Sequence, residues 1–207
     1  MEERKLTEKE SLEIITSMIA RTRERYIGDG RIILMWGYLT VVITAIIWTL
    51  IGVTHNPVWN WLWFLLWIIG GTLTPIMDKK MQQEKGFKNY SDTVTSRIWS
   101  TVGFSAIVAT AICLAFLLVG GIDAWSMMFA IALVIVPFAE IASGIVVKEK
   151  SPIIGGAIGL SAGLFTMACI AGHVALYASW FMPLFILVWV VMMIIPGHII
   201  NYKAKKQ

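Results

Sequence analysis

The chain has 207 residues, of which 57% are hydrophobic, 14% charged and 12% aromatic, and its formal net charge is +4. A soluble domain usually carries about 25% charged residues and interrupts its apolar runs at the period of amphipathic helices or strands. This chain instead repeats apolar stretches of about 20 residues, enough for a helix to cross a hydrocarbon core of about 30 Å. The composition excludes the soluble classes and predicts an all-α, polytopic membrane bundle.

The N-terminal region, residues 1–31, is polar and predicts a cytoplasmic amphipathic helix followed by a linker. Thr7 and Glu10 have the spacing of a capping box, which begins a helix. Leu12, Ile15 and Ile19 then recur at helical spacing and form an apolar stripe. Three arginines, Arg21, Arg23 and Arg25, crowd the last turns before the glycines of Gly28-Asp29-Gly30 break the helix.

Three interpretations of this helix stay open. Its apolar stripe and arginines suit a helix that lies on anionic lipid headgroups of the inner leaflet. The same stripe suits packing against the protein's own cytoplasmic face, or docking of a separate cytoplasmic protein. The segment is too short and too acidic for a nucleic-acid module.

Six apolar spans follow, and together they predict one transmembrane domain over residues 32–200. The spans are 32–53, 59–77, 98–119, 126–147, 153–172 and 180–200. Residues 201–207 are a basic tail. The first apolar run begins at Ile32 with no cleavage-like pattern after it, so we expect the first span to remain in the mature protein.

The distribution of basic residues predicts the orientation. All 17 Lys and Arg fall in the N-terminal region, the loops after spans two and four, or the C-terminal tail. Cytoplasmic segments carry such an excess, so both termini are expected in the cytoplasm. Trp59, Trp61, Trp125 and Trp180 all fall at the other face, where amphipathic indoles favour the interface.

Internal similarity among the spans predicts three tandem helical hairpins. The segment RIILMWGYLTVVITAI from Arg31 matches RIWSTVGFSAIVATAI from Arg97 at seven of sixteen positions. The even-numbered spans add Pro75, Pro137 and Pro196, each near the cytoplasmic end. Three hairpins in the same orientation are typical of transporters with parallel repeats.

Glu140 is the most informative single residue. It lies eight positions before Lys148, about 12 Å inside the fourth span at 1.5 Å per residue. An acidic group at that depth costs about 2.5–3.5 kcal/mol and usually marks an ion, proton or substrate path. The alternative is a structural carboxylic acid that is protonated or hydrogen-bonded to a neighbouring helix.

Three further residues are candidates for the same ion or substrate site. Ser143 lies on the same helical face as Glu140. Asp78 follows Pro75 by three residues, as Glu140 follows Pro137, and His198 follows Pro196 by two. If the repeats hold, Asp78, Glu140 and His198 converge around a pseudo-threefold axis. Simple contact of Asp78 and His198 with headgroup water is the alternative.

The outer face offers a candidate metal site. His55, Asp123 and His173 come one from each proposed hairpin, and imidazoles with a carboxylate can hold a transition metal. Isolated polar interface residues are the alternative, because no tight ligand spacing joins the three. Cys113 and Cys169 lie inside apolar spans and are expected to be packing residues.

The stretch EKESLEIITSMIARTRER, followed closely by WGYLTVVI, resembles the start of a group of small uncharacterised bacterial multi-spanning inner membrane proteins. The resemblance covers mainly the first fifty residues. It implies a bacterial inner membrane setting and supplies no activity.

These observations favour a small transporter or channel-like protein for an ion or small solute, with Glu140 as the proton or cation ligand. The rival is a membrane sensor or regulatory subunit that couples through its N-terminal helix to a cytoplasmic partner. No nucleophile lies beside a base in the sequence, so no catalytic residue is named and an enzyme is not favoured. No cofactor is predicted, and the oligomeric state is not readable from the sequence.

Overall fold

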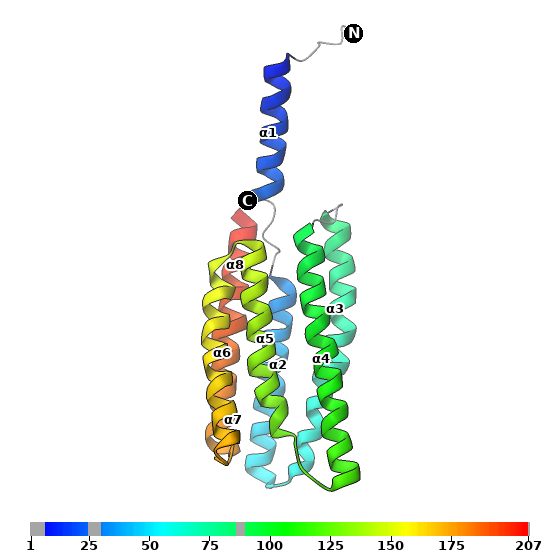
Figure 1. The fold of residues 1–207 in the computed structure, drawn as a ribbon, viewed down its shortest axis with the longest axis vertical. Coiled ribbons are helices and arrows are strands. Elements are labelled where there is room, and N and C mark those ends of the chain that lie inside the picture. Colours follow the sequence, from blue (N-terminus) through cyan, green and yellow to red (C-terminus); the bar gives the residue numbers. More distant parts are fainter. Residues whose placement is uncertain (1–6, 25–29, 86–89, 207) are drawn as a thin grey trace.

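The computed structural model describes residues 7–24, 30–85 and 90–206, and within these ranges every regular element is a helix (Figure 1). The elements in chain order are α1 (Glu8–Glu24), α2 (Arg31–Thr54), the 3-10 helix η1 (Pro57–Leu62), α3 (Trp63–Lys85), α4 (Tyr90–Gly120), α5 (Ser126–Val147), α6 (Lys150–Ala171), α7 (Ala178–Trp189), the π-helix η2 (Val190–Ile194) and α8 (Ile195–Lys206).

Six helices or helical runs are long and apolar enough to span a membrane. They are Arg31–Thr54, Pro57–Glu84, Tyr90–Gly120, Ser126–Val147, Lys150–Ala171 and the continuous run Ala178–Lys206. The last run joins α7, η2 and α8 end to end. The all-helical fold and the six spans predicted from the sequence are therefore confirmed, and they support a multi-pass membrane protein.

Helix α1 begins with reciprocal hydrogen bonds between Thr7 and Glu10. The Thr7 backbone N–H donates to Glu10 Oε2 over 2.9 Å, and the Glu10 backbone N–H donates to Thr7 Oγ1 over 3.3 Å. The Thr7 backbone N–H and the Thr7 hydroxyl, which both donate to Glu10 Oε2, hold the pKa of the Glu10 carboxyl below its usual value. The side chains of residues 17–24 and all of residues 25–29 lie outside the described part. The predicted places of Ile19, the arginines and Gly28-Asp29 fall there.

The bundle has two distinct ends. At the basic end α2 begins, α8 ends, and the turn around Lys148 joins α5 to α6; at the aromatic end α2 stops and α5 and α7 begin (Figure 1). In space the spans follow the order α3, α2, the α7–η2–α8 run, α6, α5 and α4, each packed against the next. Consecutive spans of each proposed hairpin pack together, but the most extensive packing joins α5 to α6, which belong to different proposed hairpins.

Glycines explain why α5 and α6 approach so closely. A side-chain carbon at Gly156 would stand 2.7 Å from the Pro137 carbonyl oxygen, and one at Gly163 would overlap the Leu133 carbonyl oxygen. On α5, a carbon at Gly144 would stand 2.8 Å from Ile153 Cγ1. Small residues at such positions let two membrane helices bring their backbones into contact.

The last span is held between α2 and α6 by the same device. Gly37 of α2 lies against Ile194, and Gly155 of α6 lies against the Met192 carbonyl oxygen. Between them the helix widens over Val190–Ile194, where the Ile195 backbone N–H donates to the Val190 carbonyl. Pro196 lies two residues after the end of the π-helix and has no N–H to donate, which favours a local break in the backbone hydrogen bonds of the helix.

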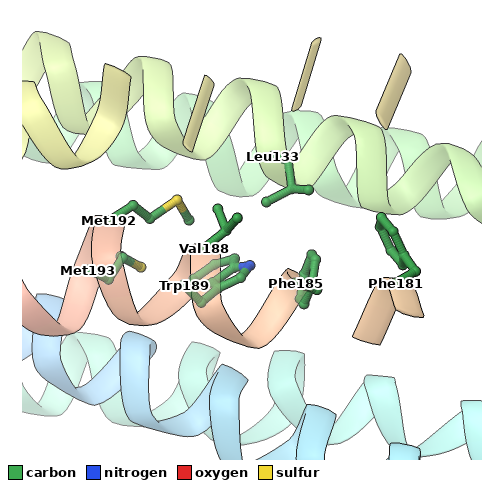
Figure 2. Close-up of a cluster of buried hydrophobic side chains, with 7 residues drawn as sticks. All are labelled: Leu133, Phe181, Phe185, Val188, Trp189, Met192 and Met193. Atoms are coloured by element: carbon green, nitrogen blue, oxygen red, sulfur yellow. The ribbon is translucent and has the colours of Figure 1, made fainter. Parts of the chain in front are cut away.

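An apolar cluster fills the interior between the middle of the bundle and its aromatic end. We call it the core cluster, and Figure 2 shows Leu133 of α5 pointing toward the side chains of α7. Its members are Leu133, Phe181, Phe185, Val188, Trp189, Met192 and Met193. Phe129 packs edge-on against Phe181 and Phe185, with ring centroids 4.9 and 5.3 Å apart. Such aromatic contacts stabilise more than their buried area alone.

Candidate functional site

Glu140 is buried deep in the bundle on the face of α5 that carries the core. Phe129, Leu133, Val136 and Glu140 follow one another at steps of four, three and four, so they form one stripe along the helix. Leu133 belongs to the core cluster, and Phe129 and Val136 pack against it. Glu140 is only 1% exposed. It therefore occupies the place where the apolar stripe would continue toward the basic end.

Neither carboxylate oxygen of Glu140 has a hydrogen-bond partner among the described residues. A buried polar group of this kind is normally hydrogen-bonded, since leaving one unpaired costs about 1–3 kcal/mol and more for a charge. The described residues therefore include no Thr, Ser or Trp hydrogen-bonded to Glu140, as the alternative of a hydrogen-bonded structural acid requires. Both oxygens are left without a protein donor among the described residues.

The contacts of its neighbours place Glu140 between α5, α6 and the last span. Pro137, three residues before it, lies against Gly156 and Gly159, and Gly144, four residues after it, lies against Ile153. Gly155, next to Gly156, meets Met192 and Pro196. Because helices rise 1.5 Å per residue, Glu140 lies at about the level of the π-helix and Pro196.

Two prolines free backbone carbonyls close to this level. Pro137 cannot donate to the Leu133 carbonyl, which faces Gly163 instead, and Pro196 likewise cannot donate to the Met192 carbonyl, which faces Gly155. In transporters, backbone carbonyls released from broken helices coordinate cations near the bilayer centre. Each of these two carbonyls lacks the backbone donor that a residue other than proline would supply.

Two other polar side chains without partners lie nearer the middle of the bundle, and sequence reasoning missed them. Thr40 of α2 is 1% exposed and Trp189 of α7 is 5% exposed, yet neither the Thr40 hydroxyl nor the Trp189 indole N–H has a partner among the described residues. By contrast, Thr44 and Thr49 of the same helix α2 both donate to the carbonyl four residues earlier. In the sequence, the spacing of four between Thr40 and Thr44 shows that both lie on one face of the helix. The sequence does not show that the Thr40 hydroxyl has no partner.

Ser143 shares the buried surroundings of Glu140. It is 7% exposed, and its hydroxyl also has no partner among the residues that the structure describes. Serine hydroxyls in membrane helices usually donate back to the preceding turn, as Ser100 and Ser161 do here. Ser143 is therefore a second buried oxygen on α5 without a partner among the described residues.

Asp78 and His198, the other predicted members of this site, have partners elsewhere. Asp78 Oδ2 accepts a hydrogen bond of 2.6 Å from Gln82 of its own helix, and His198 Nε2 lies 2.7 Å from the Tyr38 hydroxyl. Within residues 7–24, 30–85 and 90–206, no three His, Cys, Asp or Glu side chains gather closely enough to hold a metal. The predicted convergence with Glu140 is not formed, because α3 packs mainly on α2 and meets α5 at the aromatic end, where Trp63 contacts Phe129.

The predicted metal ligands His55, Asp123 and His173 are not brought together either. His55 ends α2, Asp123 Oδ1 accepts from the Trp125 backbone N–H over 3.0 Å, and His173 follows α6. Both histidines hold left-handed backbone conformations where their helices stop. The three residues lie at helix ends and in a loop, and they form no cluster that could hold a metal within the described residues. Cys113 and Cys169 are free and buried, as packing residues would be.

Ion pairs at the basic end were also missed by sequence reasoning. Lys203 Nζ of α8 lies 2.7 Å from Glu149 Oε2, and the Glu149 side chain is only 10% exposed. The Lys203 side chain is 46% exposed. Arg31 of α2 pairs with Glu84 of α3 over 2.5 Å, and these side chains are 40% and 46% exposed. The partners are more than fifty residues apart in the sequence, so their proximity depends on packing.

Comparison with known proteins adds no name to this site: no protein-family model, no curated protein and no solved structure matches the chain.

Proposed function

We propose that the protein transports an ion or small solute across a bilayer, with Glu140 as the proton or cation ligand. The observation that carries the proposal is a carboxylate 1% exposed whose oxygens have no partner in the described chain. Placing an acidic group near the bilayer centre costs about 2.5–3.5 kcal/mol, and such groups usually mark ion or proton paths. Ser143 and the carbonyls freed by Pro137 and Pro196 support the assignment by adding oxygen ligands.

A transporter with alternating access fits better than an open channel. The core cluster separates Glu140 from the aromatic end with tightly packed Phe, Trp and Met side chains. A permanently open pore needs a polar lining along its length. An ion bound at Glu140 would thus need a conformational change to leave through the aromatic end.

We also propose the finer architecture. It comprises three tandem hairpins, a cytoplasmic amphipathic N-terminal helix, and both termini on the cytoplasmic side of a bacterial inner membrane. Support comes from the one-sided Lys and Arg, and from Pro75, Pro137 and Pro196 near the basic ends of their spans.

Thiol labelling in intact cells tests this orientation, after Cys113 and Cys169 are replaced by Ser. An impermeant thiol reagent should label single cysteines at Asn56, Asp123 and Ser179 and should spare one at Gln83. Labelling at Gln83 would overturn the orientation.

The transport proposal is tested by proton flux into vesicles loaded with a pH-sensitive dye. Purified protein should carry protons in response to an imposed gradient of pH, Na⁺ or K⁺, and Glu140→Gln should abolish this flux because the neutral amide neither releases a proton nor neutralises a cation. Asp123→Asn is the matched control, since it removes a carboxylate outside the spans. Equal flux in wild type and Glu140→Gln contradicts the proposal.

A sensor or regulatory subunit is the second candidate function, and helix α1 favours it. Leu12 is 64% exposed and Ile15 is 54% exposed, so the described part of the stripe is not covered by the bundle. Such a stripe suits anionic headgroups or a cytoplasmic protein partner. Deleting residues 1–26 should leave insertion intact. If the deletion abolishes binding to anionic vesicles or to a partner while proton flux is absent in both forms, the regulatory function gains and transport fails.

A further inference from the structure

The Glu149–Lys203 ion pair lies on the side of Glu140 that faces the basic end. Glu149 lies in the turn between α5 and α6, where it caps the start of α6. Its backbone N–H donates to the Gly144 carbonyl over 2.9 Å. A side-chain carbon at Gly144 would stand 3.0 Å from the Glu149 carbonyl oxygen, so Glu149 lies directly against that turn of α5. Gly144 is one helical turn, about 6 Å, beyond Glu140. The ion pair is therefore about one to two turns from the buried carboxylate.

The pair also joins the two elements that enclose Glu140. Glu149 precedes α6, which packs on α5 through its glycines, and Lys203 belongs to α8. Lys203 Nζ and Glu149 Oε2 are 2.7 Å apart, with Glu149 almost fully buried. Charge-assisted hydrogen bonds are shorter and stronger than neutral ones, so this contact links α8 to the start of α6, although the Lys203 side chain is 46% exposed.

The segment before α8 has the features of a hinge. The π-helix Val190–Ile194 and Pro196 interrupt the regular hydrogen bonds between α7 and α8. Helices bend most readily where the ladder is interrupted in this way. Movement of α8 about this segment would break the Tyr38–His198 contact with α2 and carry Lys203 away from Glu149. It would not move α7, which belongs to the core cluster.

We propose that the Glu149–Lys203 ion pair is the gate between Glu140 and the water at the basic end, opened by movement of α8 about the π-helix and Pro196. The gate rests on the proposed function, since it regulates access of the proton or cation to Glu140. In the described structure the gate is closed, and the core cluster closes the other side. Breaking the ion pair opens the basic side alone.

The test measures how fast a thiol beside Glu140 reacts with a water-soluble reagent. Cys113 and Cys169 are first replaced by Ser, and Ser143→Cys then places one buried thiol one turn from Glu140. The probe is 2-(trimethylammonium)ethyl methanethiosulfonate, added to the full-length protein in detergent at a temperature below its melting point. In this parent, labelling should be slow because residue 143 is buried.

Lys203→Met should raise the labelling rate about tenfold. The buried thiol reacts only when the site opens, so its labelling rate rises with the fraction of open molecules. Lys206→Met is the matched control, because it removes the same charge from the same helix and Lys206 lies over the Tyr202 ring instead. Its rate should equal that of the parent. The exchanged pair Glu149→Lys with Lys203→Glu should restore slow labelling. If Lys203→Met fails to fold, Glu149→Gln replaces it with the same expectation.

The gate is overturned if Lys203→Met labels no faster than the parent, if Lys206→Met labels equally fast, or if the exchanged pair labels as fast as the single variant. Thiol reactivity in SDS verifies that every sample carries its cysteine. This outcome is independent of flux. If breaking the ion pair does not change the labelling rate while Glu140→Gln loses flux, only the gate fails. If breaking the ion pair raises the labelling rate while Glu140→Gln keeps full flux, only the transport function fails.

Discussion

The spans of this protein fall into two groups that bury very different shares of their length. In the most apolar stretches of α5, α6 and the last span, 39%, 33% and 44% of residues are buried inside the protein, against 6% and 17% in the spans of α3 and α4. The first group carries most of the close glycine contacts, the core cluster and Glu140, and α2, at 28%, lies between the two groups. The second packs mainly on one neighbour each, α3 on α2 and α4 on α5.

The difference shows where side chains determine the fold and where lipid replaces them. Lipid tails are as apolar as leucine, so a span such as α4 needs only length and hydrophobicity to stay in the membrane. The buried group depends on close backbone contact instead. Its glycines, prolines and unpartnered polar groups are features that lipid cannot replace, and they surround the candidate site.

The largest expected effect comes from filling the α5–α6 contact. Gly163→Leu places a side chain against the Leu133 carbonyl, so the helices must separate and the free energy of unfolding should fall by about 3 kcal/mol, at the upper end for overpacked sites. Gly103→Leu in α4 is the control, since nothing lies within 4 Å of a carbon added there. Melting in detergent should fall only for Gly163→Leu. Equal losses would remove the distinction between the two groups.

A smaller effect is expected where α3 is attached to α2. The Trp36 indole N–H donates to Thr74 Oγ1 over 2.9 Å, and the ring lies against Gly70. Trp36→Phe removes this hydrogen bond, worth about 1 kcal/mol. Hydrogen exchange should rise in α3 while that of α5 and α6 stays unchanged, and Trp48→Phe on the exposed face of α2 should alter neither. Faster exchange throughout the bundle would show that α3 is part of the packed group.

The smallest effect is expected from the exposed ion pair. Glu84→Gln breaks its pairing with Arg31, and because both side chains are about half exposed the loss in the free energy of unfolding should be small. Glu149→Gln should cost more, since its carboxylate is nearly buried beside Lys203. Both are measured by chemical unfolding. A reversed order would contradict the assignment of Glu149 to the packed group.

The features that could be predicted from the sequence are those that depend only on residues close together in the chain. Hydropathy over about 20 residues marks each span without knowledge of its neighbours, and the Thr7–Glu10 capping box is a four-residue pattern. Glu140 was identifiable because one carboxylate inside an apolar run is costly wherever its neighbours lie. The partners of Asp78 and His198, the unused hydroxyl of Thr40 and the Glu149–Lys203 pair depend on how distant helices align, which no local pattern encodes.

The central claim is that Glu140 is present for function and contributes nothing to the fold, and the stability of Glu140→Leu tests it most directly. Leucine would continue the apolar stripe of Leu133 and Val136 and remove a buried carboxyl without partners, which costs about 1–3 kcal/mol. The variant should therefore melt at or above the wild-type temperature in the same detergent. Melting well below the wild type would mean that Glu140 holds the bundle together, and it would contradict the site proposed here.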